Sequence, residues 1–362
     1  MRILVAPDKF AGTLSAVEAA EAIAAGWQRQ APGDELDLAP MSDGGPGFVD
    51  VLHATLGGEL LVETVAGPFG EAVPSTVLLV GETAYVESAQ ACGVHLTGAE
   101  RAEHAATTGV GQLLSAAIDA GARTVVVGLG GSGTNDAGAG LLGALGAVAD
   151  VPLDRGAFGF NGIRHLELDA ARERLADVRL VAATDVDSPL TGLFGATKTF
   201  GPQKGITEER MPLVDGLLEG FAAVADFRTS LEKGAGAAGG LGYALLLLGA
   251  ERAAGIDLVA EAVGLPERAG RADVVITGEG AFDFSSRAGK VPAGVAAVAA
   301  AALRPCVVLA GQVLVGSREM RALGMDAAYS LVDLVGEEEA LADAEGALAL
   351  LAQRVARTWS AQ

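Results

Sequence analysis

Short apolar runs that end in glycine, a carboxylate or both recur along this chain, and they restrict its fold to a small set. The first run is residues 2–6, followed by Asp8 and Lys9, and a late one is residues 274–277, followed by Gly-Glu-Gly. Strands that alternate with helices are typical of α/β folds with a parallel sheet, whose ligands bind beyond the carboxyl ends of the strands. The pattern therefore predicts an α/β fold with a polar site at the strand ends.

The spacing of the runs predicts two domains. The chain opens with strand and helix in alternation, and Ser15 with Glu18 forms a capping box for the first helix. The following residues predict strands in hairpins, and the alternation later returns and closes the chain. A length of 362 residues also suits two domains. We expect a doubly wound parallel-sheet domain from residues 1–66 and 268–362, interrupted by an inserted α/β domain of residues 67–267.

Composition excludes several kinds of partner. The formal net charge is −21, so the field of the protein repels nucleic acids and anionic membranes. Cys92 and Cys306 offer neither a disulfide framework nor metal-ligand spacing. The N-terminus lacks the apolar region of a signal peptide. We therefore expect a cytoplasmic protein with a small-molecule substrate and no nucleic-acid or membrane partner, and leave a homo-oligomer open.

The glycine-rich segment 128–140 is the most informative strand end. It predicts a turn that opens a helix, where backbone amides and the helix N-terminus favour an anion. Gly128, Gly130 and Gly133 match the dinucleotide pattern G-x-G-x-x-G, but 51 glycines make such a match weak, and an NAD-dependent dehydrogenase is the lesser alternative. The turn residues expected to bind a nucleotide cofactor are Gly130, Gly131, Ser132, Gly133, Thr134 and Asn135.

Carboxylates and lysines at the strand ends indicate Mg²⁺-assisted phosphoryl transfer. Mg²⁺ takes oxygen ligands, and the reaction needs cations or amides along the phosphates and a carboxylate near the attacking hydroxyl. Asp185 and Asp187 would point the same way in an extended segment, although Asp187 could simply cap the following turn. Lys204 follows a Gly-Pro turn and Lys290 opens a helix. Each lysine is either an anion contact or an ordinary loop residue.

Eight motifs follow one another in a fixed order along nearly the whole chain. They are Ala-Pro-Asp-Lys-Phe-Ala-Gly-Thr-Leu-Ser-Ala (6–16), Met-Ser-Asp-Gly-Gly-Pro-Gly (41–47), Thr-Thr-Gly-Val-Gly (107–111), Gly-Gly-Ser-Gly-Thr-Asn-Asp-Ala-Gly (130–138), Thr-Asp-Val-Asp-Ser-Pro-Leu (184–190), Phe-Gly-Pro-Gln-Lys-Gly (200–205), Gly-Ala-Gly-Ala-Ala-Gly-Gly-Leu-Gly (234–242), and Thr-Gly-Glu-Gly (277–280) with Asp283 and Gly289-Lys290. Together they resemble the bacterial glycerate kinase family. The resemblance implies ATP- and Mg²⁺-dependent phosphorylation of D-glycerate at its 2-hydroxyl, by two α/β domains with the site between them.

Three positions depart from the pattern of that family. Its first loop usually carries Phe-Lys-Gly, whereas here Lys9 precedes Phe10 and Ala11 takes the lysine position. Pro46 stands where a Glu is usual, and Ala281 where an Arg is usual. These departures leave the exact acid open, so a kinase for a related hydroxy acid and a non-catalytic small-acid binding protein remain alternatives.

The candidate site residues then fall into groups by expected role, beside the turn residues already named. They are Asp185, Asp187, Asp283 and Lys290 for catalysis, the first two also as Mg²⁺ ligands; Lys204 for the nucleotide; and Asp8, Lys9, Asp43, Gly44, Gly45, Asp136 and Glu279 for the substrate.

Overall fold

The chain folds into two compact units. The computed structural model describes residues 1–10, 12–287 and 290–360, without the side chains of Ser285 and Arg287. Unit 1 consists of residues 1–43, 50–57 and 255–362, and unit 2 of residues 44–49 and 58–254. Ala11 and Gly289, two positions named above, lie outside the described residues.

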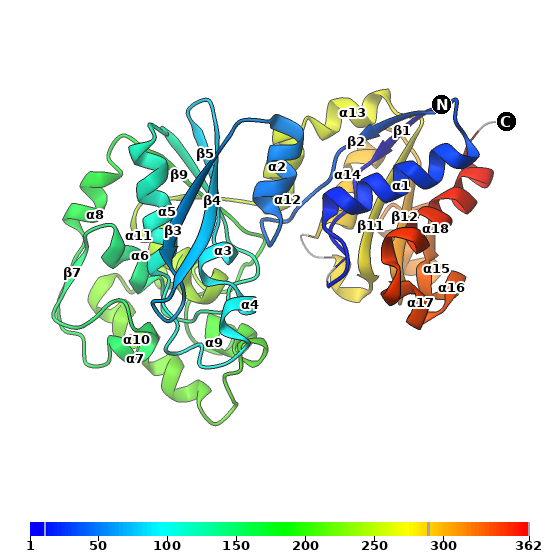
Figure 1. The fold of residues 1–362 in the computed structure, drawn as a ribbon. Helices are drawn as coiled ribbons and strands as arrows, with labels where there is room; N and C mark the ends of the chain where they lie inside the picture. The colour runs from blue at the N-terminus through cyan, green and yellow to red at the C-terminus, as the bar shows by residue number, and fades with distance from the viewer. Residues whose placement is uncertain (11, 288–289, 361–362) are drawn as a thin grey trace. The chain divides into compact units, whose positions relative to one another are not determined.

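Unit 1 is built on a five-stranded parallel sheet (Figure 1). In spatial order the strands are β13 (Ala327–Ser330), β12 (Cys306–Val313), β11 (Val274–Phe282), β1 (Arg2–Val5) and β2 (Glu35–Leu38). The chain runs from β1 to β2 on one side and later continues from β11 outward on the other. Such a reversal is the topological switch point of a doubly wound sheet, where ligands bind beyond the strand ends. Here it lies between β1 and β11.

Helices α1 (Ala16–Gln30) and α18 (Ala344–Trp359) pack side by side on this sheet (Figure 1). Helix α1 begins with the predicted capping box, in which Ser15 and Glu18 bond reciprocally. Trp27 and Leu348 lie in the core that these helices form with the sheet. Helices α12 (Gly255–Ala262), α13 (Leu265–Arg271) and α14 (Val291–Ala301) contact one another, α13 also contacts β1, and α14 contacts β11 and β12.

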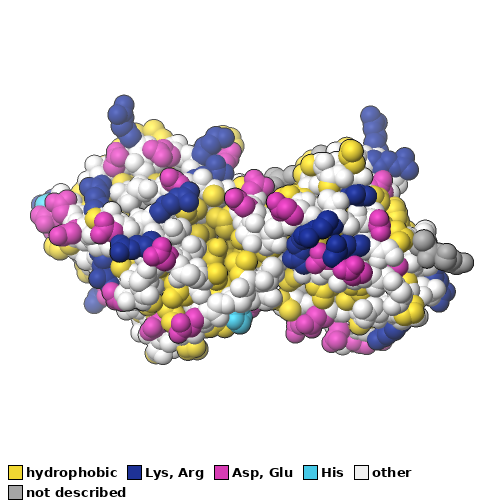
Figure 2. All heavy atoms as spheres, turned by 90° about the horizontal axis from the view of Figure 1, so that it is seen from above, with side chains coloured by type: hydrophobic (Ala, Val, Ile, Leu, Met, Phe, Trp, Pro, Cys, Tyr) yellow, Lys and Arg dark blue, Asp and Glu magenta, His cyan; other side chains and the backbone are white. Residues whose placement is uncertain are grey.

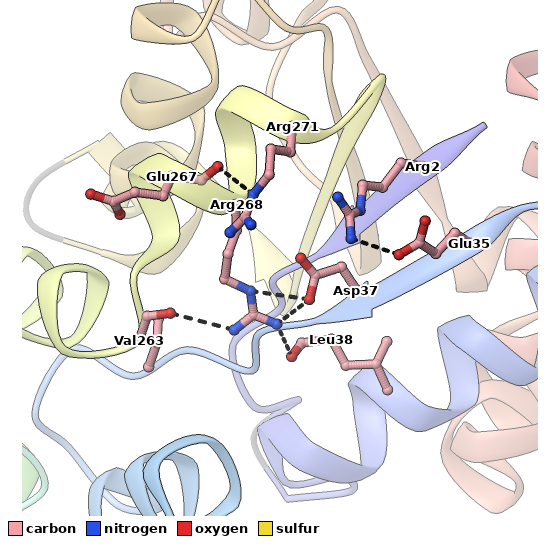
Figure 3. Close-up of polar contacts among 8 residues, drawn as sticks. All are labelled: Arg2, Glu35, Asp37, Leu38, Val263, Glu267, Arg268 and Arg271. Carbon is pink, nitrogen blue, oxygen red and sulfur yellow. Dashed lines mark hydrogen bonds and ion pairs between the residues drawn. The ribbon is translucent and has the colours of Figure 1, made fainter.

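Arg268 of α13 ties this helix to the edge strand β2 (Figure 3). Its guanidinium donates to Asp37 Oδ1 at 2.5 and 3.1 Å and to the Leu38 carbonyl oxygen at 2.5 Å. A weaker bond reaches the Val263 carbonyl oxygen at 3.4 Å. Charge-assisted bonds from one guanidinium to a neighbouring carboxylate and carbonyl fix orientation as well as distance. The pairing therefore fastens the late segment of unit 1 to its first 43 residues.

Unit 2 contains a six-stranded mixed sheet. In spatial order its strands are β10 (Glu251–Ala253), β9 (Arg179–Ala183), β6 (Thr124–Gly128), β5 (Thr83–Glu87), β4 (Ala72–Val80) and β3 (Glu59–Ala66). The pairs from β10 to β5 are parallel, and the pairs from β5 to β3 are antiparallel hairpins. This arrangement confirms the predicted α/β class and the predicted hairpins.

The units divide at different residues from the domains expected from sequence. Strand β3 pairs with β4 along its whole length, so residues 58–66 join unit 2 rather than the first segment of the chain. Residues 44–49 also join unit 2, because the Gly130 amide donates to the Gly44 carbonyl and the Gly47 amide donates to Glu87. The later division falls at residue 255. Each shift depends on pairing between segments distant in sequence.

Helices α5 (Thr108–Asp119), α6 (Ala139–Ala144), α10 (Met211–Ala225) and α11 (Leu241–Leu247) enclose the core of unit 2. Phe221 lies at its centre, against Phe160 and Tyr243. The shorter elements of the chain are α2 (Phe48–Leu56), α3 (Ala89–Cys92), α4 (Val94–Thr97), β7 (Val148–Ala149), α7 (Gly156–Gly159), β8 (Leu166–Glu167), α8 (Asp169–Arg174), α9 (Ala196–Phe200), α15 (Ser317–Ala322), α16 (Leu331–Val335), α17 (Glu337–Ala342) and four 3₁₀ turns, Pro202–Lys204, Thr229–Leu231, Ala237–Gly240 and Phe284–Arg287.

The surface carries charges of both signs. On the face drawn in Figure 2, Lys and Arg side chains stand singly or in small groups, with Asp and Glu side chains among them. In the part of the chain that the structure describes, no helix has both the length and the apolar character needed to cross a membrane.

Candidate functional site

The loop after β1 brings Asp8 to the switch point of the unit 1 sheet. The Asp8 amide donates to the Gly278 carbonyl of β11 at 2.8 Å, which fixes the loop beside that strand. The Asp8 carboxylate is buried and accepts the Lys9 amide at 2.7 Å, with the Lys9 ammonium 3.8 Å away. Burial raises the pKa of Asp8 to about 6, and the charge of Asp43 adds to the rise, whereas Lys9 and Lys290 oppose it.

Glu279 lies in β11, on the other side of the switch point, and is also buried. Its Oε1 accepts a hydrogen bond from Ser286 Oγ at 2.5 Å. Burial raises the pKa of Glu279 to about 7; the Ser286 bond and the charge of Lys290 lower it, and Asp8 and Asp283 raise it. Two carboxyls with pKa values near neutral, at the ligand-binding edge of a parallel sheet, are typical of a site that moves protons.

Unit 1 thus gathers one group of the predicted site residues. Asp43 and Lys290 act electrostatically on Asp8, and Lys290, Asp8 and Asp283 act on Glu279. Lys290 is the N-cap residue of α14. The elements that carry them are neighbours through the β1–β11 pairing rather than through sequence.

The glycine-rich turn after β6 uses much of its backbone within unit 2. The amides that donate to backbone carbonyls are those of Gly130 (to Gly44), Gly133 (to Cys92), Asn135 (to Ala102) and Ala137 (to Gly239). Among the described residues, the Gly131 and Ser132 amides have no carbonyl partner, and Gly131 is exposed. An anion could therefore reach the turn at the exposed Gly131 and bond to its amide and to that of the buried Ser132, whereas the four paired amides hold the fold.

The glycines that match the dinucleotide pattern serve close backbone packing. A Cβ on Gly128 would lie 2.6 Å from the Gly44 carbonyl oxygen, and one on Gly130 would lie 2.4 Å from Gly45 Cα. A Cβ on Gly133 would lie 2.3 Å from a side-chain oxygen of α4. These contacts explain all three glycines, so the pattern needs no dinucleotide, and Gly44 and Gly45 act as packing partners of the turn.

Asp136 is fully buried at the end of the same turn. Its Oδ2 accepts from the Thr107 amide (2.9 Å), the Thr107 hydroxyl (2.8 Å) and the Gly140 amide (3.2 Å), and its Oδ1 accepts from the Gly138 amide (3.0 Å). Burial raises its pKa, and these donors oppose the rise. Four donors from the start of α5 and the start of α6 make Asp136 a residue that holds the turn in shape.

Lys204 reaches the turn from the 3₁₀ turn Pro202–Lys204 and is buried. Its ammonium donates to Ser132 Oγ at 3.0 Å and to the Thr134 carbonyl oxygen at 2.7 Å. Burial lowers its pKa to about 8, while the charge of Asp136 acts in the opposite direction. Lys204 therefore braces the residues beneath the exposed end of the turn.

Asp185 and Asp187 follow β9, and their surroundings differ. Asp185 is half-buried, whereas Asp187 is exposed and forms ion pairs with Arg252 at 2.6 Å and Lys233 at 2.8 Å. The Lys233 bond and the Arg252 charge hold the pKa of Asp187 below its usual range. Each oxygen of Asp187 thus faces a cation.

An Mg²⁺ ion suits Asp185 better than Asp187. Mg²⁺ in kinases commonly binds one or two carboxylates, with the remaining ligands from phosphates and water. The described residues hold no group of three or more His, Cys, Asp or Glu that could bind a metal without such help. Asp185 fits this sparse ligand set, whereas Asp187 would first have to exchange two cations for the metal.

Three residues that matter here received no role from the sequence, although Thr107 lies in one of the eight motifs. Thr107 donates twice to Asp136, Arg252 pairs with Asp187, and Ser286 bonds to Glu279. Arg252 lies in a strand of three residues with no recognisable pattern. The Asp-x-x-Ser spacing of Asp283 and Ser286 is typical of a side-chain-closed turn and could have drawn attention to Ser286.

Known proteins that resemble this chain match it over nearly its full length. The glycerate kinase family profile matches residues 3–360. The glycerate kinase of Bacillus subtilis is 40% identical over 347 residues, covering 92% of this chain and 90% of that protein. The glycerate 2-kinase of Escherichia coli is 38% identical over 349 residues, covering 93% and 92%. A solved structure from Salmonella typhimurium LT2, named for glycerate kinase 2, superposes with a TM-score of 0.83 at 34% identity, covering 99% and 98% of the two chains.

Proposed function

Since this chain belongs to the glycerate kinase family, we propose that it transfers the terminal phosphoryl group of ATP to the 2-hydroxyl of D-glycerate, with Mg²⁺ on the phosphates. Family membership makes the chain an enzyme that phosphorylates glycerate; the donor, the metal and the hydroxyl are the proposed parts. The observation that carries the proposal is the pair of buried carboxyls, Asp8 and Glu279, beside Lys290 at the switch point of unit 1.

The reaction needs a group that accepts the hydroxyl proton. As the glycerate oxygen bonds to the γ-phosphorus, the bond from that phosphorus to the β–γ bridging oxygen breaks and ADP leaves. We assign the proton to Glu279, whose pKa of about 7 suits proton uptake at neutral pH. Lys290 would supply positive charge to the glycerate carboxylate or to a phosphate oxygen. Asp8, Lys9, Asp43 and Asp283 would complete the polar surroundings.

Unit 2 carries its own set of predicted site residues. The Gly131 and Ser132 amides would bind an anionic group of the nucleotide or of the acid, since adjacent amides in a turn form an anion site. Lys204 would keep the turn in shape through Ser132 and Thr134. Asp185 would hold Mg²⁺, which when bound neutralises charge on the phosphate oxygens. Asp187 would balance the charge of Arg252 and Lys233.

One assay tests the proposal against its alternatives. ADP release would be followed by a coupled reaction with D-glycerate, L-glycerate and other small hydroxy acids, with Mg²⁺ and with a chelator. We expect release with D-glycerate and Mg²⁺, and loss of release on chelation. A preference for another acid would change the substrate, and an NAD-dependent absorbance change without ADP release would replace the kinase by a dehydrogenase. Binding of the acid without turnover would indicate a sensor.

The position of the phosphate needs a separate measurement. Phosphorus–proton correlation in an NMR spectrum of the product distinguishes 2-phosphoglycerate from 3-phosphoglycerate, because the coupled protons differ. We expect the coupling to the proton on C2. Coupling to the C3 protons would leave the kinase proposal standing and overturn the assignment of the hydroxyl.

A further inference from the structure

Ser286 is a buried side chain for which the proposed reaction has no use so far. Its exposed fraction is 0%, it lies in the 3₁₀ turn Phe284–Arg287, and its hydroxyl meets Glu279. We infer that Ser286 is a positioning residue, which fixes the orientation of the Glu279 carboxyl and favours the ionised form that accepts a proton. The inference rests on the proposed function only for the catalytic role of Glu279.

The direction of the Ser286 hydrogen bond follows from its neighbours. The Asp283 amide donates to Ser286 Oγ at 3.2 Å, and the Ser286 amide donates to the Asp283 carbonyl oxygen at 3.1 Å. A hydroxyl carries one proton, and here the amide occupies an acceptor position of the oxygen. Because an ionised carboxylate can only accept, the hydroxyl proton is donated to Glu279 Oε1, 2.5 Å away. The two bonds between Asp283 and Ser286 close the turn and hold the Ser286 side chain in this orientation.

The charges around Glu279 show why such a donor matters. Burial, Asp8 and Asp283 disfavour the ionised carboxylate, and Lys290 favours it. A hydrogen bond to the charged form of a carboxylate lowers its pKa. If Ser286 donated no proton, Lys290 would be left to oppose the rise in the Glu279 pKa that burial, Asp8 and Asp283 cause. A larger fraction of Glu279 would then hold its own proton at neutral pH, and that fraction could not take one from a hydroxyl.

A plain structural role for Ser286 makes a different prediction. If the serine only closes its turn, its loss would lower stability without changing the titration of Glu279. Thr277 offers a matched control. It lies on β11, the strand of Glu279, is as buried as Ser286, and its hydroxyl donates to the Ala6 carbonyl oxygen at 2.9 Å. Thr277→Val removes one buried donor that does not touch Glu279.

The test measures the pKa of Glu279 by carbon-13 NMR of the glutamate carboxyls, with the signal assigned through Glu279→Gln. In Ser286→Ala we expect this pKa to rise by about one unit, the size of one charge-assisted hydrogen bond. In Ser286→Thr, which keeps the hydroxyl, and in Thr277→Val, it should stay at the wild-type value. The acidic limb of kcat/KM for glycerate should move with the pKa.

The results separate this inference from the proposed function. A folded Ser286→Ala protein with an unchanged Glu279 pKa would overturn the inference. If Ser286→Ala does not fold, Ser286→Cys, a weaker donor on a somewhat larger atom, should give a smaller rise, and no rise would overturn the inference. A shifted pKa in a protein that releases no ADP with glycerate would support the positioning role and reject the proposed reaction. A shifted pKa with an unmoved kcat/KM profile would remove Glu279 as the proton acceptor.

Discussion

Two buried carboxyls, Asp136 in unit 2 and Glu279 in unit 1, lie beside strand ends and are treated in opposite ways by their surroundings. Asp136 receives four donors distributed over both oxygens. Among the described residues, Glu279 receives one donor, from Ser286, and has Asp8 and Asp283 as unfavourable neighbours. In each case burial is the largest influence on the pKa and raises it.

The number of donors separates a structural carboxylate from a reactive one. A carboxylate whose lone pairs are filled by backbone amides shapes the chain and has little capacity left for a ligand. A buried carboxyl with few donors costs folding free energy and remains available for proton transfer. The Asp136 turn is thus built to be rigid, and the Glu279 cluster is built to react.

The largest expected effect is on activity at the reactive carboxyl. Glu279→Gln removes the proton acceptor and should lower kcat/KM for glycerate by about 10³-fold, within the usual range for a general base. Circular dichroism should show an unchanged fold. Glu261→Gln removes an exposed carboxylate of the same unit and should leave activity unchanged. A loss below about tenfold for Glu279→Gln would place the proton elsewhere.

The next effect is on stability at the structural carboxyl. Asp136→Asn replaces one carboxylate oxygen by an NH2 group, whose N–H donors would face the donors that surround Asp136. The substitution should lower the free energy of unfolding by about 3 kcal/mol. Urea unfolding of wild type and Asp136→Asn would measure the loss at about pH 7.5, where ordinary carboxyls are charged. Asp8→Asn is the matched change in unit 1 and should cost far less. Equal losses would erase the contrast between the two sites.

The sequence foretold the strand ends better than it foretold their partners. The helix beginning after Ser15 follows from local signals, because a capping box and an apolar periodicity act within a few residues. The placement of Asp8 and Glu279 at one sheet edge follows from the βα rhythm, since parallel strands share their carboxyl edge. These features need no knowledge of distant contacts.

The surroundings of each group depend on the three-dimensional fold and could not be foreseen. Thr107 approaches Asp136 from 29 residues earlier in the chain, and Lys204 approaches Ser132 from 72 residues later. Nothing in the composition of a Gly-Pro turn shows that its lysine is buried. The same limit affected β3, whose place in unit 2 depends on its pairing with β4. Burial and donor count separate a structural carboxylate from a reactive one, and both are tertiary properties.

A third prediction concerns the pH dependence of stability at Glu279. The pKa of Glu279 in the folded state, about 7, lies above its ordinary value. At pH values between these two pKa values the folded state therefore binds more protons than the unfolded state. The associated stability is fully present below about pH 4 and is lost as the pH rises through about 7. Glu279→Gln does not titrate, so its free energy of unfolding relative to wild type should increase by about 3 kcal/mol between about pH 4 and about pH 8. Urea unfolding at both pH values measures this, and a constant difference would contradict the assigned environment.

A smaller effect is expected at the exposed end of the glycine-rich turn. Gly131 has φ +75°, and a Cβ there would lie 2.7 Å from the Pro46 ring. Gly131→Ala should therefore cost about 2 kcal/mol, of which about 1 is backbone strain. Gly162→Ala is the control, since Gly162 has φ +79° and nothing within 4 Å, and should show the strain alone. If both substitutions cost the same, Pro46 yields to the new methyl group and the turn is less rigid than Asp136 implies.

The smallest effect is expected at Asp187, where exposure weakens every interaction. Its ion pairs with Lys233 and Arg252 are screened by solvent, and exposed pairs contribute little to stability. Asp187→Asn should barely change the melting temperature and should leave the Mg²⁺ concentration for half-maximal ADP release within about twofold of wild type, whereas loss of a metal ligand, as in Asp185→Asn, should raise it about tenfold or more. Titration of Mg²⁺ at fixed ATP compares the three proteins directly. A tenfold rise for Asp187→Asn as well would make both carboxylates metal ligands, and Lys233 and Arg252 would then be the groups that the metal displaces.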